Sequence, residues 1–88
     1  MFVKIVLDTP FAGTEEEEYM EFPNETAARL AFQEMVNDHA DGYEYLVLGW
    51  GVSPETEEDE IELEYFREGC YENSYWEEIS EEEYYENY

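Results

Sequence analysis

Acidic residues dominate this chain: 26 of its 88 residues are Asp or Glu, only Lys4, Arg29 and Arg67 are basic, and the formal net charge is −23. Three cations can pair with at most three carboxylates, so ion pairs within the chain leave most of the charge uncompensated. Such an imbalance opposes a compact state through self-repulsion. The fold must therefore spread its carboxylates over the surface, and we expect a strongly basic partner to offset the repulsion that remains.

The apolar content is nevertheless that of a folded protein. Hydrophobic residues make up 43% of the chain and aromatic residues 18%, more than an acidic disordered chain contains. A chain of this length buries only about 60 to 65% of its unfolded surface, and a homodimer would enlarge its core. We expect a single α+β domain over residues 1–88, monomeric or homodimeric. Its core spans residues 1–66, and residues 67–88 form an acidic, aromatic C-terminal helix or tail.

The first forty residues contain the clearest local patterns. Apolar side chains alternate over residues 3–8, which predicts a first strand. A turn-rich segment then leads to a second strand over residues 19–22, and the two strands are expected to form a hairpin. Asn24 is a favoured N-cap residue. Apolar residues recur at helical spacing after it, which predicts a helix over residues 25–38 that packs across the sheet.

Two further strands are predicted in the second half of the chain. Residues 43–52 are apolar on both alternating sets, as in a central strand that is buried on both faces. Residues 60–66 alternate between Glu and apolar residues, which predicts a strand with Glu60, Glu62 and Glu64 on one exposed face. These carboxylates would lie about 6.6 to 7 Å apart along the strand. Successive phosphates of a nucleic-acid strand have a similar separation.

The C-terminal segment mixes acidic and aromatic residues. Ser74 and Glu77 have the spacing of a capping box, which predicts a short helix over residues 75–85. Carboxylates accept paired hydrogen bonds from Arg, and aromatic rings stack on guanidinium groups, so this helix suits a basic partner. Together with the three Glu residues above, the predicted partner-binding residues are Tyr75, Trp76, Glu77, Glu78, Glu81, Glu82, Glu83, Tyr84 and Tyr85. In the alternative interpretation the aromatic residues cover the core, and the Glu residues are simply solvated.

These elements together predict an α+β fold, with a small and mostly antiparallel sheet of about four strands, one helix packed across it and a short C-terminal helix or tail. Cys70 is the only cysteine, so an intramolecular disulfide is excluded, as is usual in a reducing compartment. The apolar stretch at the N-terminus is too short for a signal peptide or a bilayer span. We therefore expect a cytoplasmic protein that binds neither membranes nor, for lack of a basic surface, nucleic acid itself.

Catalytic and metal-binding patterns are weak. The acidic runs lack the glycine-centred spacing of calcium loops. Asp38, His39 and Asp41 offer three potential ligands, but a single histidine at a helix end more often has a structural role. The sequence contains no catalytic triad with flanking glycine motifs and no phosphate-binding loop. We expect no enzymatic activity, no cofactor and no specific metal site.

In length, charge, scarcity of cations and mixing of acidic with aromatic residues, the chain resembles the small acidic proteins that phages and mobile elements use against host defences. That class includes anti-CRISPR and anti-restriction proteins that mimic nucleic acid, and inhibitors of DNA-repair glycosylases. A charge of 23 corresponds to about 39 Å of duplex DNA. The resemblance implies an inhibitor that occupies the basic groove of a defence protein in an infected bacterial cell. A CRISPR effector is the first expected target, and restriction or repair enzymes come next.

Three other interpretations remain open at this stage. An acidic binding module or chaperone for basic proteins would have a similar composition. A halophilic protein would also be acidic, although we would expect more Asp than the 4 that accompany 22 Glu here. A cation-binding protein would be stabilised by millimolar Ca²⁺ far more than by matched ionic strength from a monovalent salt.

Overall fold

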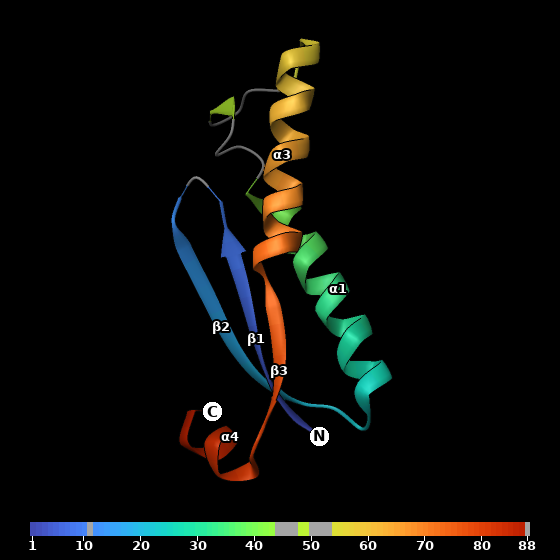
Figure 1. The fold of residues 1–88 in the computed structure, drawn as a ribbon, viewed down its shortest axis with the longest axis vertical. Helices are drawn as coiled ribbons and strands as arrows, with labels where there is room; N and C mark the ends of the chain where they lie inside the picture. The colour runs from blue at the N-terminus through green and yellow to red at the C-terminus, as the bar shows by residue number, and fades with distance from the viewer. Residues whose placement is uncertain (11, 44–47, 50–53, 88) are drawn as a thin grey trace.

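The computed structural model describes residues 1–10, 12–43, 48–49 and 54–87, and these form an α+β fold (Figure 1). The elements are β1 (Phe2–Thr9), β2 (Thr14–Glu21), α1 (Glu25–Gly42), α3 (Glu57–Asn73), β3 (Tyr75–Ile79) and α4 (Glu81–Asn87). The three strands form an antiparallel sheet in the order β2-β1-β3. This arrangement confirms the predicted class. The number of strands differs, because the described sheet has three and about four were predicted.

The predicted hairpin is confirmed, and its second strand is longer than expected. β1 pairs with β2 from Phe2 opposite Glu21 to Thr9 opposite Thr14. Gly13 has a left-handed φ of 67°, and its N–H donates to the carbonyl of Thr9 at 3.1 Å, which closes the turn. The four consecutive Glu residues 15–18 disfavour a strand by propensity. Pairing with the apolar β1 strand outweighs this preference, because strand propensity depends strongly on context.

Helix α1 begins where the sequence predicted and ends four residues later. The side chain of Asn24 accepts a hydrogen bond from the N–H of Ala27 at 2.9 Å, as expected of the N-cap. Ala28, Val36 and Ala40 face the core. The helix continues past the predicted end at Asp38 because Ala40 is fully buried, which adds a further turn of apolar contact.

One hydrophobic core lies between the sheet and the two long helices. The core residues are Val3, Ile5 and Leu7 of β1, Ala28, Val36 and Ala40 of α1, and Phe66 and Cys70 of α3. Residue 66, the predicted end of the core region, lies inside α3, and residues on both sides of it contribute to the same core. Gly69 allows α3 to pass close to Pro10, since a Cβ at residue 69 would meet the proline ring at 2.7 Å.

The strand predicted over residues 60–66 is wrong, because these residues belong to α3. Thr56 is the N-cap of this helix, and its side chain accepts a hydrogen bond from the N–H of Asp59 at 3.2 Å. Residues 57–60 are all acidic and lie in the first turn, where the positive end of the helix dipole favours carboxylates. Phe66 and Cys70 are spaced one helical turn apart and are both buried. This spacing, rather than the alternation that precedes it, decides the structure.

The helix predicted over residues 75–85 is also wrong for its first half. Ser74 is buried and does not begin a helix: its hydroxyl accepts the backbone N–H of Asp8 at 2.9 Å, and its own N–H donates to Cys70. The chain then extends as β3, which pairs with β1. The real helix, α4, follows Ser80, whose hydroxyl accepts the N–H of Glu83 at 3.1 Å. The serine that caps a helix is thus six residues further along.

The predicted central strand over residues 43–52 lies largely outside the described residues. Among the described residues, two helices, α1 and α3, rather than one, cover the sheet on the side of the core (Figure 1). The molecule is elongated, with extents of 48 × 23 × 19 Å and a radius of gyration of 15.1 Å, larger than the roughly 12 Å of a compact chain of this length. No helix among the described residues is both long enough and apolar enough to span a membrane.

Candidate interaction surface

The sheet has a second face, opposite α1 and α3, which we call the open face. Direct partners across an antiparallel ladder point to the same side, so the register shows which side chains share it. The open face is formed by Phe2, Lys4, Val6 and Asp8 of β1, Glu15, Glu17, Tyr19 and Glu21 of β2, and Tyr75, Glu77 and Ile79 of β3. Five carboxylates therefore share this face with one lysine.

Lys4 lies at the centre of the open face. Its Nζ atom is 3.4 Å from Oε1 of Glu17, and its side chain is only 21% exposed. The hydrogen bond to Glu17 raises the pKa of Lys4 above its ordinary value of 10.5, so the lysine is charged at neutral pH. Glu77 is its direct partner in β3. One cation thus stands between carboxylates from both neighbouring strands, and the face as a whole keeps a net negative charge.

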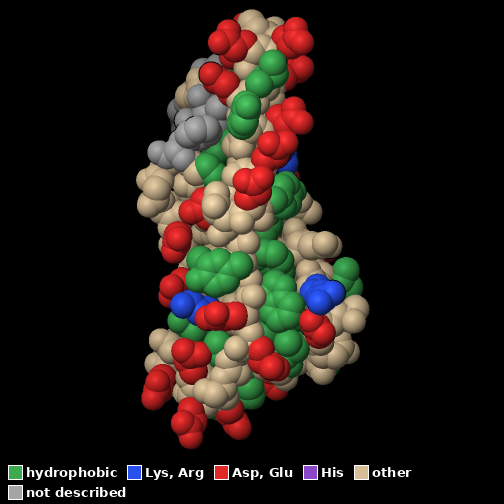
Figure 2. Space-filling view, viewed as in Figure 1, with side chains coloured by type: hydrophobic (Ala, Val, Ile, Leu, Met, Phe, Trp, Pro, Cys, Tyr) green, Lys and Arg blue, Asp and Glu red, His purple; other side chains and the backbone are tan. Residues whose placement is uncertain are grey.

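Exposed aromatic rings accompany these carboxylates. Tyr75, the partner of Val6 in the ladder, is 46% exposed. At the end of the sheet, α4 packs its Tyr84 ring against Phe2 with the ring centroids 4.7 Å apart, and Tyr85 remains 64% exposed. Figure 2 shows acidic side chains beside hydrophobic ones over the length of the molecule. Carboxylates and aromatic rings therefore lie side by side on a folded surface.

The fold separates the predicted C-terminal residues. Tyr75 and Glu77 lie on the open face, whereas Trp76 and Glu78 alternate to the other side of β3, where Trp76 packs against the core. In α4, Tyr84 is buried. The other α4 residues on the predicted list are exposed: Glu81, Glu82, Glu83 and Tyr85. Of the four predicted aromatic anchors, Tyr75 and Tyr85 are therefore accessible to a partner, and the other two serve mainly the fold.

The predicted row of Glu60, Glu62 and Glu64 does not exist. In a helix these residues follow one another at about 100° per residue, so Glu60 and Glu64 lie one turn apart on one side and Glu62 points to nearly the opposite side. All three are exposed on α3. They do not reproduce the spacing of successive phosphates, and they lie away from the open face.

Sequence reasoning missed the contribution of β2. Glu15, Glu17 and Glu21 reach the open face together with Tyr19, whose hydroxyl donates to Glu17 at 3.5 Å. A run of four Glu residues shows no alternation of charge with apolar character, so its two faces cannot be told apart in the sequence. Only the pairing register with β1 separates them.

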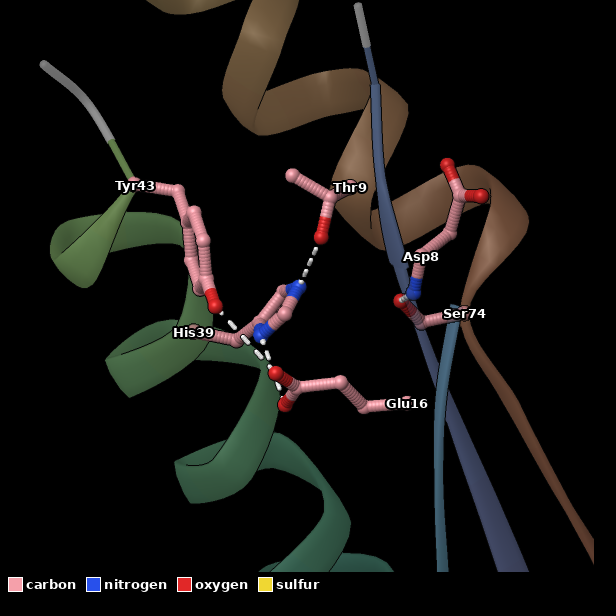
Figure 3. A network of polar contacts seen from close by, with 6 residues as sticks. All are labelled: Asp8, Thr9, Glu16, His39, Tyr43 and Ser74. Carbon is pink, nitrogen blue, oxygen red and sulfur yellow. Dashed lines mark hydrogen bonds and ion pairs between the residues drawn. The ribbon is translucent and has the colours of Figure 1, made fainter. Parts of the chain in front are cut away.

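A partly buried polar network ties α1 to the hairpin (Figure 3). His39 is 6% exposed, and its Nε2 atom is 2.8 Å from the hydroxyl of Thr9. Its Nδ1 atom is 3.6 Å from Oε2 of Glu16, and the hydroxyl of Tyr43 donates to the other oxygen of Glu16 at 3.2 Å. The Tyr43 ring lies against the imidazole with the centroids 4.8 Å apart. Every polar atom of the imidazole thus has a partner.

In this network a hydroxyl, an imidazole and a carboxylate follow one another in the same order as in a catalytic triad. Thr9, however, is only 1% exposed and lies within β1, so its hydroxyl has no access to a substrate. The network therefore serves to join β1, β2 and α1. Among the described residues, no group of three or more His, Cys, Asp or Glu side chains is arranged to hold a metal ion.

Comparison with known proteins gives no relative: no family model, no curated protein and no solved structure matches the chain.

Proposed function

We propose that this protein is an inhibitor that mimics nucleic acid and occupies the basic DNA- or RNA-binding groove of a host defence protein, with a CRISPR effector as the first candidate. The distribution of charge along the molecule carries the proposal. A net charge of −23 over a body 48 Å long is one charge per about 2.1 Å, close to the roughly 1.7 Å per charge of duplex DNA. A groove that binds a duplex segment would meet a similar charge density here.

The open face supplies the chemistry for such a contact. Arginine side chains of a nucleic-acid groove bind phosphates through paired hydrogen bonds, and carboxylates accept the same geometry. Glu15 and Glu77 are exposed on this face, on opposite edges of the sheet. Tyr75 and Tyr85 offer exposed rings on which a guanidinium group stacks as it does on a base.

A restriction or DNA-repair enzyme is the alternative target, and an acidic chaperone for basic proteins is the alternative function. The fold favours a shaped mimic over a generic polyanion, because its acidic residues lie on a sheet and on helices packed against it. β3 is hydrogen-bonded to the central strand, and α4 is anchored through Tyr84. A rigid arrangement of charge selects a partner by shape as well as by sign.

The test is capture of partners from a bacterial lysate on the immobilised protein at moderate salt, with and without competing duplex DNA. We expect one nucleic-acid-binding protein in stoichiometric amount, displaced by the DNA. The captured protein, once purified, must then lose its own DNA or RNA binding when this chain is added. Recovery of only a diffuse set of basic proteins, bound in proportion to their charge, would contradict the proposal and favour the chaperone.

A matched pair of double variants then locates the contact. Glu15→Gln with Glu77→Gln removes two charges from the open face, and Glu60→Gln with Glu64→Gln removes the same number from α3. We expect the first variant to weaken binding at least about tenfold, which corresponds to about 1.4 kcal/mol, and the second to have a much smaller effect. Equal losses would mean that only total charge matters.

A further inference from the structure

The outer side of α1 carries an apolar groove in an otherwise acidic molecule. The groove has a volume of about 590 Å³ and is lined by Phe22, Ala27, Leu30, Ala31, Gln33, Glu34 and Asn37. Leu30 is 60% exposed, and it lies on the opposite side of the helix from the buried Ala28 and Val36. Contiguous exposed apolar surface is a feature of interaction sites, so the groove is a candidate docking surface.

Charge identifies the occupant. Among the described residues that line the groove, Glu34 supplies the single carboxylate and no basic side chain is present. α1 as a whole has four acidic residues and one Arg, whereas α3 has eight acidic residues and one Arg in almost the same length. In Figure 2, acidic side chains crowd the ends of the molecule formed by α3 and α4, and over α1 a basic side chain lies beside an acidic one. A basic partner would find few carboxylates here.

We propose that the outer face of α1 is a self-association surface, on which a second copy of this chain packs its own α1 through a two-fold axis. Two copies, each with a charge of −23, repel one another at every acidic face. They can approach most closely where the charge is least. A two-fold interface is formed by the same patch on both copies, so the apolar groove around Leu30 meets its own equivalent. Ala27 and Ala31, which are small, allow the helices to approach closely.

The dimensions suit a modest interface. An interface of standard size buries about 800 Å² per partner, about one eighth of the 5985 Å² surface of this chain. α1 has 18 residues and is therefore about 27 Å long, enough for several turns of helix contact. The helix covers the side of the sheet opposite the open face, so a dimer leaves both open faces accessible. Self-association is therefore independent of the function proposed above.

Sedimentation equilibrium at two salt concentrations tests this inference, with protein concentrations up to about 1 mM. At about 0.1 M salt the Debye length is about 10 Å, and at about 1 M it is about 3 Å. Since salt screens the repulsion between copies, we expect the dissociation constant to fall at least about tenfold between these conditions. Binding of a basic target changes in the opposite direction, because it weakens as salt rises. The two proposals can therefore fail separately.

Two variants distinguish the α1 surface from other exposed apolar residues. Leu30→Glu places a charge at the centre of the groove, and Ile61→Glu places the same charge at a 48% exposed position of α3. We expect Leu30→Glu to abolish the dimer at high salt and Ile61→Glu to leave it unchanged, with circular dichroism confirming that both variants are folded. A wild-type protein that is monomeric at both salt concentrations would overturn the proposal, and so would a dimer that survives Leu30→Glu.

Discussion

Helices α1 and α3 pack against the same face of one sheet, yet they differ in charge and in how clearly the sequence predicts them. α1 has 18 residues and a net charge of −3, and α3 has 17 residues and a net charge of −7. The core contact of α1 is spread over Ala28, Val36 and Ala40, while that of α3 rests on Phe66 and Cys70 in its second half. The comparison shows that a few buried residues suffice to hold a highly charged helix in place.

The two helices are also linked to each other by polar contacts. Arg67 of α3 forms an ion pair with Asp41 of α1, and the hydroxyl of Tyr71 donates to the side chain of Asn37. These contacts are partly or fully exposed, and exposed ion pairs contribute little to stability. The apolar core and the helix caps therefore decide the stability of both helices, and the variants below compare the two helices at these points.

The largest effect is expected at the main anchor of α3. Phe66→Ala removes a fully buried ring and is expected to cost about 3 to 5 kcal/mol, whereas Val36→Ala in α1 should cost about 2 kcal/mol. Urea denaturation measures both. Tyr65→Ala is the control, since Tyr65 is 67% exposed and its loss should be nearly neutral. If Phe66→Ala does not fold, Phe66→Leu gives the measurable intermediate. A smaller loss for Phe66→Ala than for Val36→Ala would reverse the comparison.

A smaller effect is expected at the polar attachment of α1. Thr9→Val keeps the shape of the side chain but removes the hydroxyl that lies 2.8 Å from Nε2 of His39. An unsatisfied buried imidazole nitrogen should cost about 1 to 3 kcal/mol. Thr9→Ser retains the hydroxyl and should recover most of this loss. Equal stability of the Val and Ser variants would show that the network does not contribute to holding α1.

The two N-caps allow a direct comparison of how the helices begin. Asn24→Ala and Thr56→Ala each remove a side-chain acceptor from the first turn and should each cost about 1 kcal/mol of unfolding free energy. Serine at either position should restore the stability. If α3 depended on its core contact alone, Thr56→Ala would have no effect while Asn24→Ala kept its full cost.

Cys70 provides a pH-dependent test of the α3 core. Burial, followed by the nearby charge of Asp8, raises the pKa of its thiol above 9.0. The thiol ionises at lower pH in the unfolded chain, so the unfolding free energy falls as pH rises above about 9. The slope due to this group is at most about 1.4 kcal/mol per pH unit. Cys70→Ala should show a shallower decline over the same range. Identical slopes would mean that the thiol ionises equally in both states.

The smallest effect is expected from charge within the helices. Glu64 and Glu68 are like charges one turn apart in α3, beyond its first turn, and Glu34 and Asp38 have the same spacing in α1. Neutralising either pair with the corresponding amides should stabilise the protein by a few tenths of a kcal/mol. The gain should be larger in α3, where more charge is concentrated, and should shrink as salt is added. Urea titrations at low and high salt compare the pairs.

Prediction from the sequence succeeded where the pattern was local and unambiguous. The hairpin followed from an alternating apolar strand and a turn, and α1 followed from Asn24 and a helical apolar repeat. It failed for α3, where Ile61, Leu63 and Tyr65 alternate as in a strand. Two of these three side chains, Ile61 and Tyr65, are exposed in the structure. An alternating pattern therefore misleads when the true buried residues, such as Phe66, lie outside it.

The sequence predicted which kinds of side chain form the candidate surface, but it predicted only some of the individual residues. Acidic and aromatic side chains do share a surface, and Tyr75, Glu77 and Tyr85 were among the predicted residues. The contribution of Glu15 and Glu17 required the register of β2, which four consecutive Glu residues do not reveal. The remaining members of the predicted list were distributed by the fold between the core, the other side of β3, α3 and α4.

The sequence by itself determined the excess of carboxylates, the N-terminal hairpin and the first helix, because each depends on composition or on residues close together in the chain. Tertiary structure alone decided the role of Ser74, which has a capping pattern but bonds to Asp8, 66 residues away. It also decided that residues 75–79 form a strand, since that strand exists through pairing with β1. Local preferences of a few tenths of a kcal/mol per residue are smaller than the gain from hydrogen bonds and burial made across the fold.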